Sequence, residues 1–205
     1  DSARFPGKSM ALLQGKPVIH HVITRCFKIL NVEKVILAVP DGDAQLPLIE
    51  YATNTFKTLK VFIGNEYDVL DRYYACASLH GLEYIMRVTG DCPFIDPSLC
   101  EKILDMLVNN HVDYCSNVFP TSTFYKGLDC EAFTYECLEA TDTLAESVYQ
   151  REHVTAWMQQ TDEVVKGTIR NKTNQHKERN LCVDYPGDIL RLESMMNDKV
   201  ENVNA

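Results

Sequence analysis

The chain has 205 residues, and 45% of them are apolar, which is enough to bury the core of one globular domain. Its formal net charge of −9 and its pI of about 5.1 argue against a surface that binds duplex nucleic acid, because such surfaces gather Lys and Arg. The sequence has no apolar run as long as a membrane span and no signal-peptide pattern at its start. We therefore expect a single cytoplasmic domain over residues 1–205, with no nucleic-acid or membrane partner.

Eight cysteines are scattered through the sequence, mostly inside apolar runs and without CxxC spacing. Disulfide frameworks and zinc sites usually show such paired spacings. We expect free thiols in a reducing compartment for the whole set, which is Cys26, Cys76, Cys92, Cys100, Cys115, Cys130, Cys137 and Cys182.

A glycine-bearing loop opens the sequence. Residues 1–8 include two cations, Arg4 and Lys8, on either side of Pro6-Gly7. Loops of this composition wrap phosphate groups, because backbone N–H groups line them and Arg or Lys supplies charge. A cationic amino terminus without a ligand has the same composition, so both interpretations stay open at this point.

The first half of the sequence alternates patterns typical of helices and strands. Helical spacing of apolar residues predicts helices over residues 18–30, 46–56 and 68–77, and β-branched runs predict strands over residues 35–39 and 60–64. Strands that alternate with helices are typical of a parallel sheet with right-handed crossovers. We predict an α/β fold with three layers and a mainly parallel sheet.

Residues 85–97 combine a buried apolar run with a Gly-Asp turn. Open α/β sheets bind ligands at the carboxyl ends of their strands, which is where this pattern places Asp91. A carboxylate there suits a Mg²⁺ ion that also holds substrate phosphates, and a helix-capping or turn aspartate is the alternative. Asp184 repeats the arrangement, because residues 180–184 read as a strand that ends in an acid before a turn with proline. Two such carboxylates could share one divalent ion.

The second half departs from the regular alternation. Its patterns predict helices over residues 97–109 and 189–196 and strands over residues 112–115 and 164–169. After residue 115, residues 117–126 are loop-like, with Pro120 and several Thr and Ser, and we take residues 116–150 as an insertion. An inserted segment of this kind is where we expect a substrate lobe or a dimerisation arm.

Charged side chains mark two places in this half. Alternation puts Asp129 and Glu131 on one face of a strand, where they meet either a substrate or, at a sheet edge, solvent. The second place is the start of a predicted helix over residues 151–158, which carries Arg151, Glu152 and His153. A single histidine on a helix is more often structural than catalytic, so the spacing alone does not assign a catalytic role to His153.

Seven short motifs, spread over nearly the whole sequence, occur in an order that resembles the spore-coat-polysaccharide-type cytidylyltransferases. These are relatives of the acylneuraminate and Kdo cytidylyltransferases. The motifs are Arg4-Phe5-Pro6-Gly7-Lys8, Gly15-Lys16-Pro17, Asp68-Val69-Leu70-Asp71-Arg72, Arg87-Val88-Thr89-Gly90-Asp91-Cys92-Pro93, Gly127-Leu128-Asp129, Arg151-Glu152-His153-Val154-Thr155 and Val183-Asp184-Tyr185-Pro186.

The resemblance implies a Rossmann-like nucleotide-diphospho-sugar transferase fold and the transfer of CMP from CTP to a sugar acceptor. Pyrophosphate would be released, and the product would serve surface polysaccharide or glycan biosynthesis. Mg²⁺ is the implied cofactor, held by Asp91 and Asp184, and Arg4 and Lys8 would hold the CTP phosphates. Lys8 and the two carboxylates are thus the expected catalytic residues, and a homodimer is the expected assembly.

The same resemblance assigns the other substrate contacts. The segment near the base and ribose would be Asp68, Asp71 and Arg72. The acceptor side would be Asp129, Glu131, Arg151, Glu152 and His153. Two residues of the matching motifs, Lys16 and Arg87, are assigned to the substrate as well.

Two departures from the family pattern affect these expectations. The family has an apolar strand and an arginine-bearing loop before the segment that opens this sequence, so we expect an amino-terminal piece, and internal loop residues too, to be missing from it. Gly187 also stands where the family usually carries an acid. Two other functions stay open, namely a protein of this fold that only binds a nucleotide and a related enzyme that uses another nucleoside triphosphate.

Overall fold

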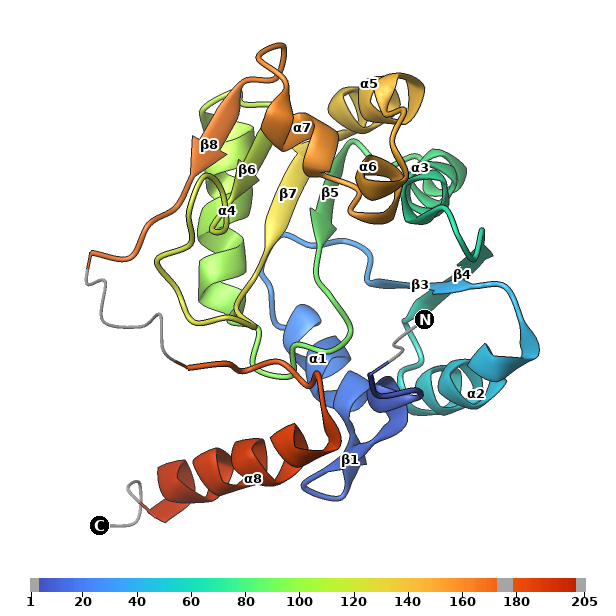
Figure 1. Cartoon of the computed structure of the whole chain (residues 1–205), viewed down its shortest axis with the longest axis vertical. Helices are drawn as coiled ribbons and strands as arrows, with labels where there is room; N and C mark the ends of the chain where they lie inside the picture. Colours follow the sequence, from blue (N-terminus) through green and yellow to red (C-terminus); the bar gives the residue numbers. More distant parts are fainter. Residues whose placement is uncertain (1–3, 173–178, 202–205) are drawn as a thin grey trace.

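Helices cover both faces of a four-stranded sheet in the computed structural model, which describes residues 4–172 and 179–201 (Figure 1). The strands lie in the order β5 (Tyr84–Arg87), β7 (Glu131–Thr134), β6 (Tyr114–Ser116) and β8 (Lys166–Thr168). β7 runs antiparallel to β5 and to β6, whereas β6 and β8 are parallel. Three of these four strands therefore point the same way, and the later strand β7 is inserted between two earlier ones.

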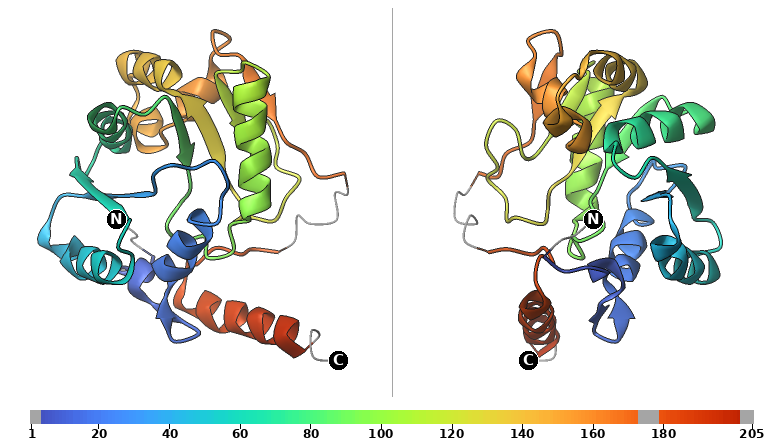
Figure 2. Two further views of the ribbon diagram at one scale, coloured as in Figure 1. Left: turned by 180° about the vertical axis from the view of Figure 1, so that it is seen from behind. Right: turned by 45° about the vertical axis from the view of Figure 1, so that its right-hand side comes forward.

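Alternating side chains of these strands build two separate core layers, because successive residues of a strand face opposite sides of the sheet. Tyr114 and Phe133 pack on one side against α3 (Val69–His80), α5 (Tyr135–Leu144) and α7 (Ala156–Gln160). The opposite side packs against α4 (Pro97–Asn109), which lies in front in the left view of Figure 2. This arrangement confirms the predicted three-layer α/β fold.

A parallel pair of strands, β3 (Ile36–Pro40) and β4 (Lys60–Gly64), forms a second, smaller sheet. Its core is closed by α1 (Val18–Cys26) and α2 (Leu46–Thr55). The short 3₁₀ turn η2 (Asp43–Gln45) leads into α2. Within the described ranges this pair has no backbone ladder to the four-stranded sheet. The predicted helices and strands of the first half are thus confirmed, with the first helix ending at Cys26.

The last helix, α8 (Pro186–Glu201), lies at the bottom of Figure 1, away from the four-stranded sheet. It packs on the hairpin of β1 (Leu12–Leu13) and β2 (Lys16–Pro17), beside the 3₁₀ turn η1 (Lys8–Met10). The core here joins distant parts of the chain, which are Leu13, Val18, Phe94, Leu181, Val183 and Leu192. The opening loop and the segment around Asp184 are therefore held against one another.

Two predicted elements are wrong. Residues 180–184 form no strand, because only Asn180 pairs with another segment, at Lys126, and the Val183 N–H instead donates to the Asp91 carbonyl at 2.9 Å. Residues 151–158 are not one helix either. α6 (Val148–Glu152) ends in this segment and α7 begins after a turn at Val154, whose φ of 54° is incompatible with a right-handed helix.

None of the helices within residues 4–172 and 179–201 is both long enough and apolar enough to cross a membrane. All eight cysteines are free, as the sequence predicts, and seven of them are buried. Their thiols fill gaps in the two layers of the core; Cys115 and Cys130, for example, are fully buried against α4.

Candidate active site

A tight turn at Gly7 places Lys8 in the interior of the site. Gly7 has a left-handed φ of 70°, which glycine adopts without steric cost, and its carbonyl accepts a hydrogen bond from the Met10 N–H at 2.9 Å. The Lys8 ammonium then contacts the carboxylate of Asp91 directly. Only 15% of the Lys8 side chain is exposed, so this cation is held by the fold.

The structure brings the two predicted carboxylates together. The backbone contact between Val183 and Asp91 joins the segments that carry them, and Lys8 lies between the side chains. The Lys8 Nζ atom is 3.8 Å from Asp184 Oδ1 while it pairs with Asp91. Asp91 lies beyond the end of β5, in a turn that packs over α1 through Gly90 and Ile19. The paired acids therefore sit in one lysine-bridged cluster.

Asp184 is the more heavily engaged of the two acids. The Lys126 ammonium lies 2.6 Å from its Oδ2 atom, and Arg4 Nη2 lies 3.9 Å from its Oδ1 atom. The hydrogen bond from Lys126 holds the pKa of the Asp184 carboxyl below its usual value, although burial acts in the opposite direction. Its side chain is 10% exposed. Asp184 is therefore an anion surrounded by three cations.

Asp188 fixes the backbone that carries Asp184. Its Oδ2 atom accepts the N–H groups of Asp184 at 2.9 Å and of Tyr185 at 2.8 Å, and Arg191 pairs with its other oxygen at 2.8 Å. Gly187, where an acid is usual in the family that the sequence resembles, has no neighbour where a side chain would extend. The acid that orders this turn is thus the next residue, Asp188.

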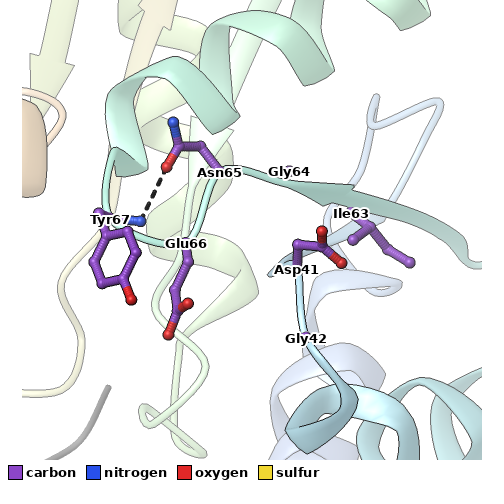
Figure 3. Close-up of a pocket in the computed structure, with 7 residues that line it drawn as sticks. All are labelled: Asp41, Gly42, Ile63, Gly64, Asn65, Glu66 and Tyr67. Atoms are coloured by element: carbon purple, nitrogen blue, oxygen red, sulfur yellow. Dashed lines mark hydrogen bonds between the residues drawn. The ribbon is translucent and has the colours of Figure 1, made fainter.

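A pocket of about 600 Å³ opens at the carboxyl ends of β3 and β4 (Figure 3). Asp41 and Gly42 line one side, and residues 63–67 line the other. The Asn65 side chain orders this second side by accepting the Tyr67 N–H at 3.0 Å, the bond drawn in Figure 3. Asp68 follows at once, so the segment assigned to the base and ribose borders this pocket.

Arg151 ties α6 to the start of α3. Its guanidinium contacts the Asp68 carboxylate and reaches the Asp142 side chain at 2.6 Å and the Asp142 carbonyl at 2.9 Å. Asp68 in turn caps α3 by accepting the Asp71 N–H at 2.9 Å. Arg72 is buried and donates to the Asn65 carbonyl. Arg151 and Arg72 are therefore committed to protein contacts that shape the rim of the pocket.

Glu131 lies inside the protein, so the alternative of a solvent-facing edge strand is wrong for it. β7 is flanked by a strand on each side, and Glu131 is 4% exposed. Arg87 donates to its Oε2 atom at 2.6 Å, and the hydroxyls of Tyr114 and Thr155 each donate to Oε1 at 2.7 Å. The amide of Gln159 adds a fourth donor at 3.0 Å. This network joins the sheet to α7.

The remaining predicted residues make no described hydrogen bond or ion pair with Asp91 or Asp184. Glu152 and His153 are exposed at the end of α6, and the His153 ring lies 4.4 Å from the Tyr149 ring. Asp129 is half-buried, and burial raises the pKa of its carboxyl. Lys16 is exposed in β2, and no described contact joins it to Asp91 or Asp184.

Lys126 is the residue of this cluster that the sequence reasoning missed. The available signal was its place directly before the Gly127-Leu128-Asp129 motif. Spacing could not reveal its partner, because Lys126 and Asp184 are 58 positions apart.

The fold is that of the Rossmann-like nucleotidyltransferases. A CTP complex of CMP:2-keto-3-deoxy-manno-octonic acid synthetase matches with a TM-score of 0.70, covering 97% of this chain and 95% of that one, at 15% identity. A family model described as cytidylyltransferase matches residues 1–198. The chain belongs to the cytidylyltransferase family, as its seven motifs predict.

Two of the individual proteins that resemble this chain are named as cytidylyltransferases. A cytidylyltransferase from Leptospira borgpetersenii matches with a TM-score of 0.89 and 26% identity, covering 96% of this chain and 82% of that chain. An uncharacterized protein of Methanocaldococcus jannaschii is 30% identical over 80% of this chain and 65% of its own length. The 3-deoxy-manno-octulosonate cytidylyltransferase of Pelobacter propionicus is 31% identical over 53% of this chain and 41% of its own length. The chain thus spans less than two thirds of the length of these two curated relatives.

Proposed function

We propose that this protein transfers CMP from CTP to a sugar acid, with release of pyrophosphate, for the synthesis of a surface glycan. The observation that carries the proposal is the lysine-bridged pair of Asp91 and Asp184 beside a cationic loop. Its family and the 3-deoxy-manno-octulosonate specificity named for several relatives support the choice of CTP and of an acidic sugar.

Mg²⁺ fits the donor set of this site. Asp91 and Asp184 supply hard carboxylate oxygens, and within the described residues no group of three or more His, Cys, Asp or Glu is placed to enclose a metal. Mg²⁺ commonly uses one or two carboxylates and completes its shell with water and substrate phosphates. We assign the ion to these two residues, and when bound it supplies positive charge to the phosphate oxygens.

The position of each residue in the site then indicates which part of the substrate it binds. Lys8 and Arg4 neutralise the triphosphate, because both already lie at the acid pair. The pocket beside Asp68 takes the base and ribose, with Asp71 and Arg72 ordering its wall. As the acceptor hydroxyl oxygen bonds to the α-phosphorus and loses its proton to solvent, the bond from phosphorus to the pyrophosphate oxygen breaks. Lys8 and Arg4 stabilise the negative charge that develops.

The acceptor side is assigned to the segments that follow β6. Asp129, Glu152 and His153 offer acceptors and donors to sugar hydroxyls, and Glu131 and Arg151 hold the surrounding elements in place. We further propose a homodimer with a contact in residues 116–150 and a cytoplasmic location. The free thiols support the reducing compartment, and light scattering of the purified protein tests the dimer.

Pyrophosphate release is the direct test of this function. The protein should release pyrophosphate from CTP and Mg²⁺ only with an acceptor, and the panel should include 3-deoxy-manno-octulosonate and other sugar acids. Thermal shifts with CTP, UTP, GTP and ATP identify the preferred nucleotide. Stabilisation by CTP without turnover on any acceptor would instead indicate a binding protein, and a larger shift with another nucleotide would indicate a different transferase.

Lys8→Ala should weaken CTP binding about tenfold or more and CMP binding much less. The reason is that Lys8 is assigned to charge-assisted hydrogen bonds with the β- and γ-phosphates, which CTP carries and CMP lacks. Titration calorimetry with each nucleotide in Mg²⁺ measures the difference. Lys102→Ala, which removes an exposed lysine of α4, is the matched control. Equal weakening of CTP and CMP binding would show that Lys8 does not bind the pyrophosphate half of the nucleotide.

A further inference from the structure

We propose that Lys126 is an exchangeable cation of this site. Without a metal it neutralises Asp184, and when a divalent cation occupies that carboxylate, Lys126 binds an anionic oxygen of the substrate. The inference rests on the proposed function and adds a residue that none of the family motifs in this sequence contains.

The contacts of Asp184 separate two kinds of lysine. Lys8 is 15% exposed and is paired with Asp91, while its distance to Asp184 is 3.8 Å. Lys126 makes the short contact, 2.6 Å to Asp184 Oδ2, yet its side chain is 55% exposed. Arg4 is exposed too, but it lies 3.9 Å from Asp184. Of the cations around Asp184, Lys126 therefore combines the short contact with an exposed side chain that can leave without disturbing the core.

The backbone below Lys126 is fixed, so only its side chain is free to move. Gly127 has a φ of 96°, and a Cβ atom there would lie 2.7 Å from the Leu181 carbonyl carbon and 2.8 Å from the Cys182 nitrogen. This close approach lets the Leu181 N–H donate to the Lys126 carbonyl at 2.7 Å. Asn117 holds the other side through the Leu128 carbonyl at 2.8 Å. The fold thus positions a long, flexible ammonium at the edge of the acid pair.

The charges indicate where this ammonium goes. Three cations, Arg4, Lys8 and Lys126, already face the two carboxylates. A divalent cation competes with Lys126 for the oxygens of Asp184, and like charges repel at such distances. A substrate anion is the group that can balance the displaced ammonium. Both the triphosphate of the nucleotide and the carboxylate of a sugar acid offer such an oxygen.

Lys126→Met tests the exchange in the whole protein, with Lys126→Arg as the conservative variant and Lys102→Met as the control for net charge. Mn²⁺ binding without nucleotide, followed by the electron paramagnetic resonance signal of the free ion, is the first measurement. We expect Lys126→Met to bind Mn²⁺ about tenfold more tightly, because a competing charge has been removed. Lys126→Arg and Lys102→Met should bind it as the unmodified protein does.

The substrate measurements identify the anion. If Lys126→Met lowers the affinity for CTP about tenfold and Lys126→Arg largely restores it, the anion that Lys126 binds is a phosphate of the nucleotide. If the affinity for CTP is unchanged and the KM for the acceptor rises about tenfold, the anion that Lys126 binds is the carboxylate of the sugar acid. The proposal is overturned if Mn²⁺ affinity does not rise, or if neither CTP affinity nor the acceptor KM changes. If the unmodified protein releases no pyrophosphate, the proposed function fails, while Mn²⁺ and CTP binding still decide the role of Lys126.

Discussion

Asp184→Asn should reduce pyrophosphate release by about a thousandfold or more while the protein keeps its fold, because charge neutralisation at phosphate is worth several kcal/mol in such reactions. The substitution keeps the size of the side chain and its ability to accept a hydrogen bond from Lys126, but it removes the negative charge. Asp91→Asn should act in the same way, since Lys8 joins the two carboxylates. Both rates are measured with saturating CTP and Mg²⁺.

Asp96→Asn provides the matched control for this charge removal. Asp96 caps α4 by accepting the Ser98 N–H at 2.9 Å, and asparagine caps helices about as well as aspartate. Its turnover should therefore be unchanged. Circular dichroism and thermal melting establish that each variant is folded. Near-normal turnover in Asp184→Asn or Asp91→Asn would show that the residue concerned does not bind the metal.

The acid pair could be predicted because its signal is local. Asp91 follows an apolar run and a glycine, and the carboxyl end of a strand is a general ligand position in α/β sheets. The same reasoning placed Asp184 at the end of a strand, which is wrong, although the structure does bring Asp184 close to Asp91. The segment before Asp184 pairs through a single bridge, and it is the contact between Val183 and the Asp91 carbonyl that brings the acids together.

Contacts that depend on the spatial order of the strands could not be predicted from the sequence. Alternation correctly put Glu131 on one face of a strand, but it does not say whether that strand is an edge or is inserted between neighbours. The prediction of one continuous helix over residues 151–158 failed for a different reason, which is the turn at Val154. β-branched residues rarely adopt positive φ, so nothing in the local sequence predicts it. Here the buried Val154 side chain and the bond from Thr155 to Glu131 hold the turn in place.

Glu131→Ala should destabilise the fold by about 3–5 kcal/mol, because removing one partner of a buried ion pair leaves the other charge uncompensated. Arg87 would lose its carboxylate, and its Nε atom already has no partner among the described residues. Tyr114 and Thr155 would lose the oxygen to which their hydroxyls donate. The free energy of unfolding from urea denaturation measures the effect.

Two comparisons separate this structural role from contact with the acceptor sugar. Glu131→Gln keeps an acceptor for Tyr114 and Thr155 and should lose less stability than the alanine variant, while Glu146→Ala, on an exposed loop, should lose almost none. If Glu131 instead binds sugar hydroxyls directly, Glu131→Ala will raise the acceptor KM and leave the urea midpoint nearly unchanged. The buried network predicts the reverse, a large fall in stability from a residue whose four donors all belong to the protein.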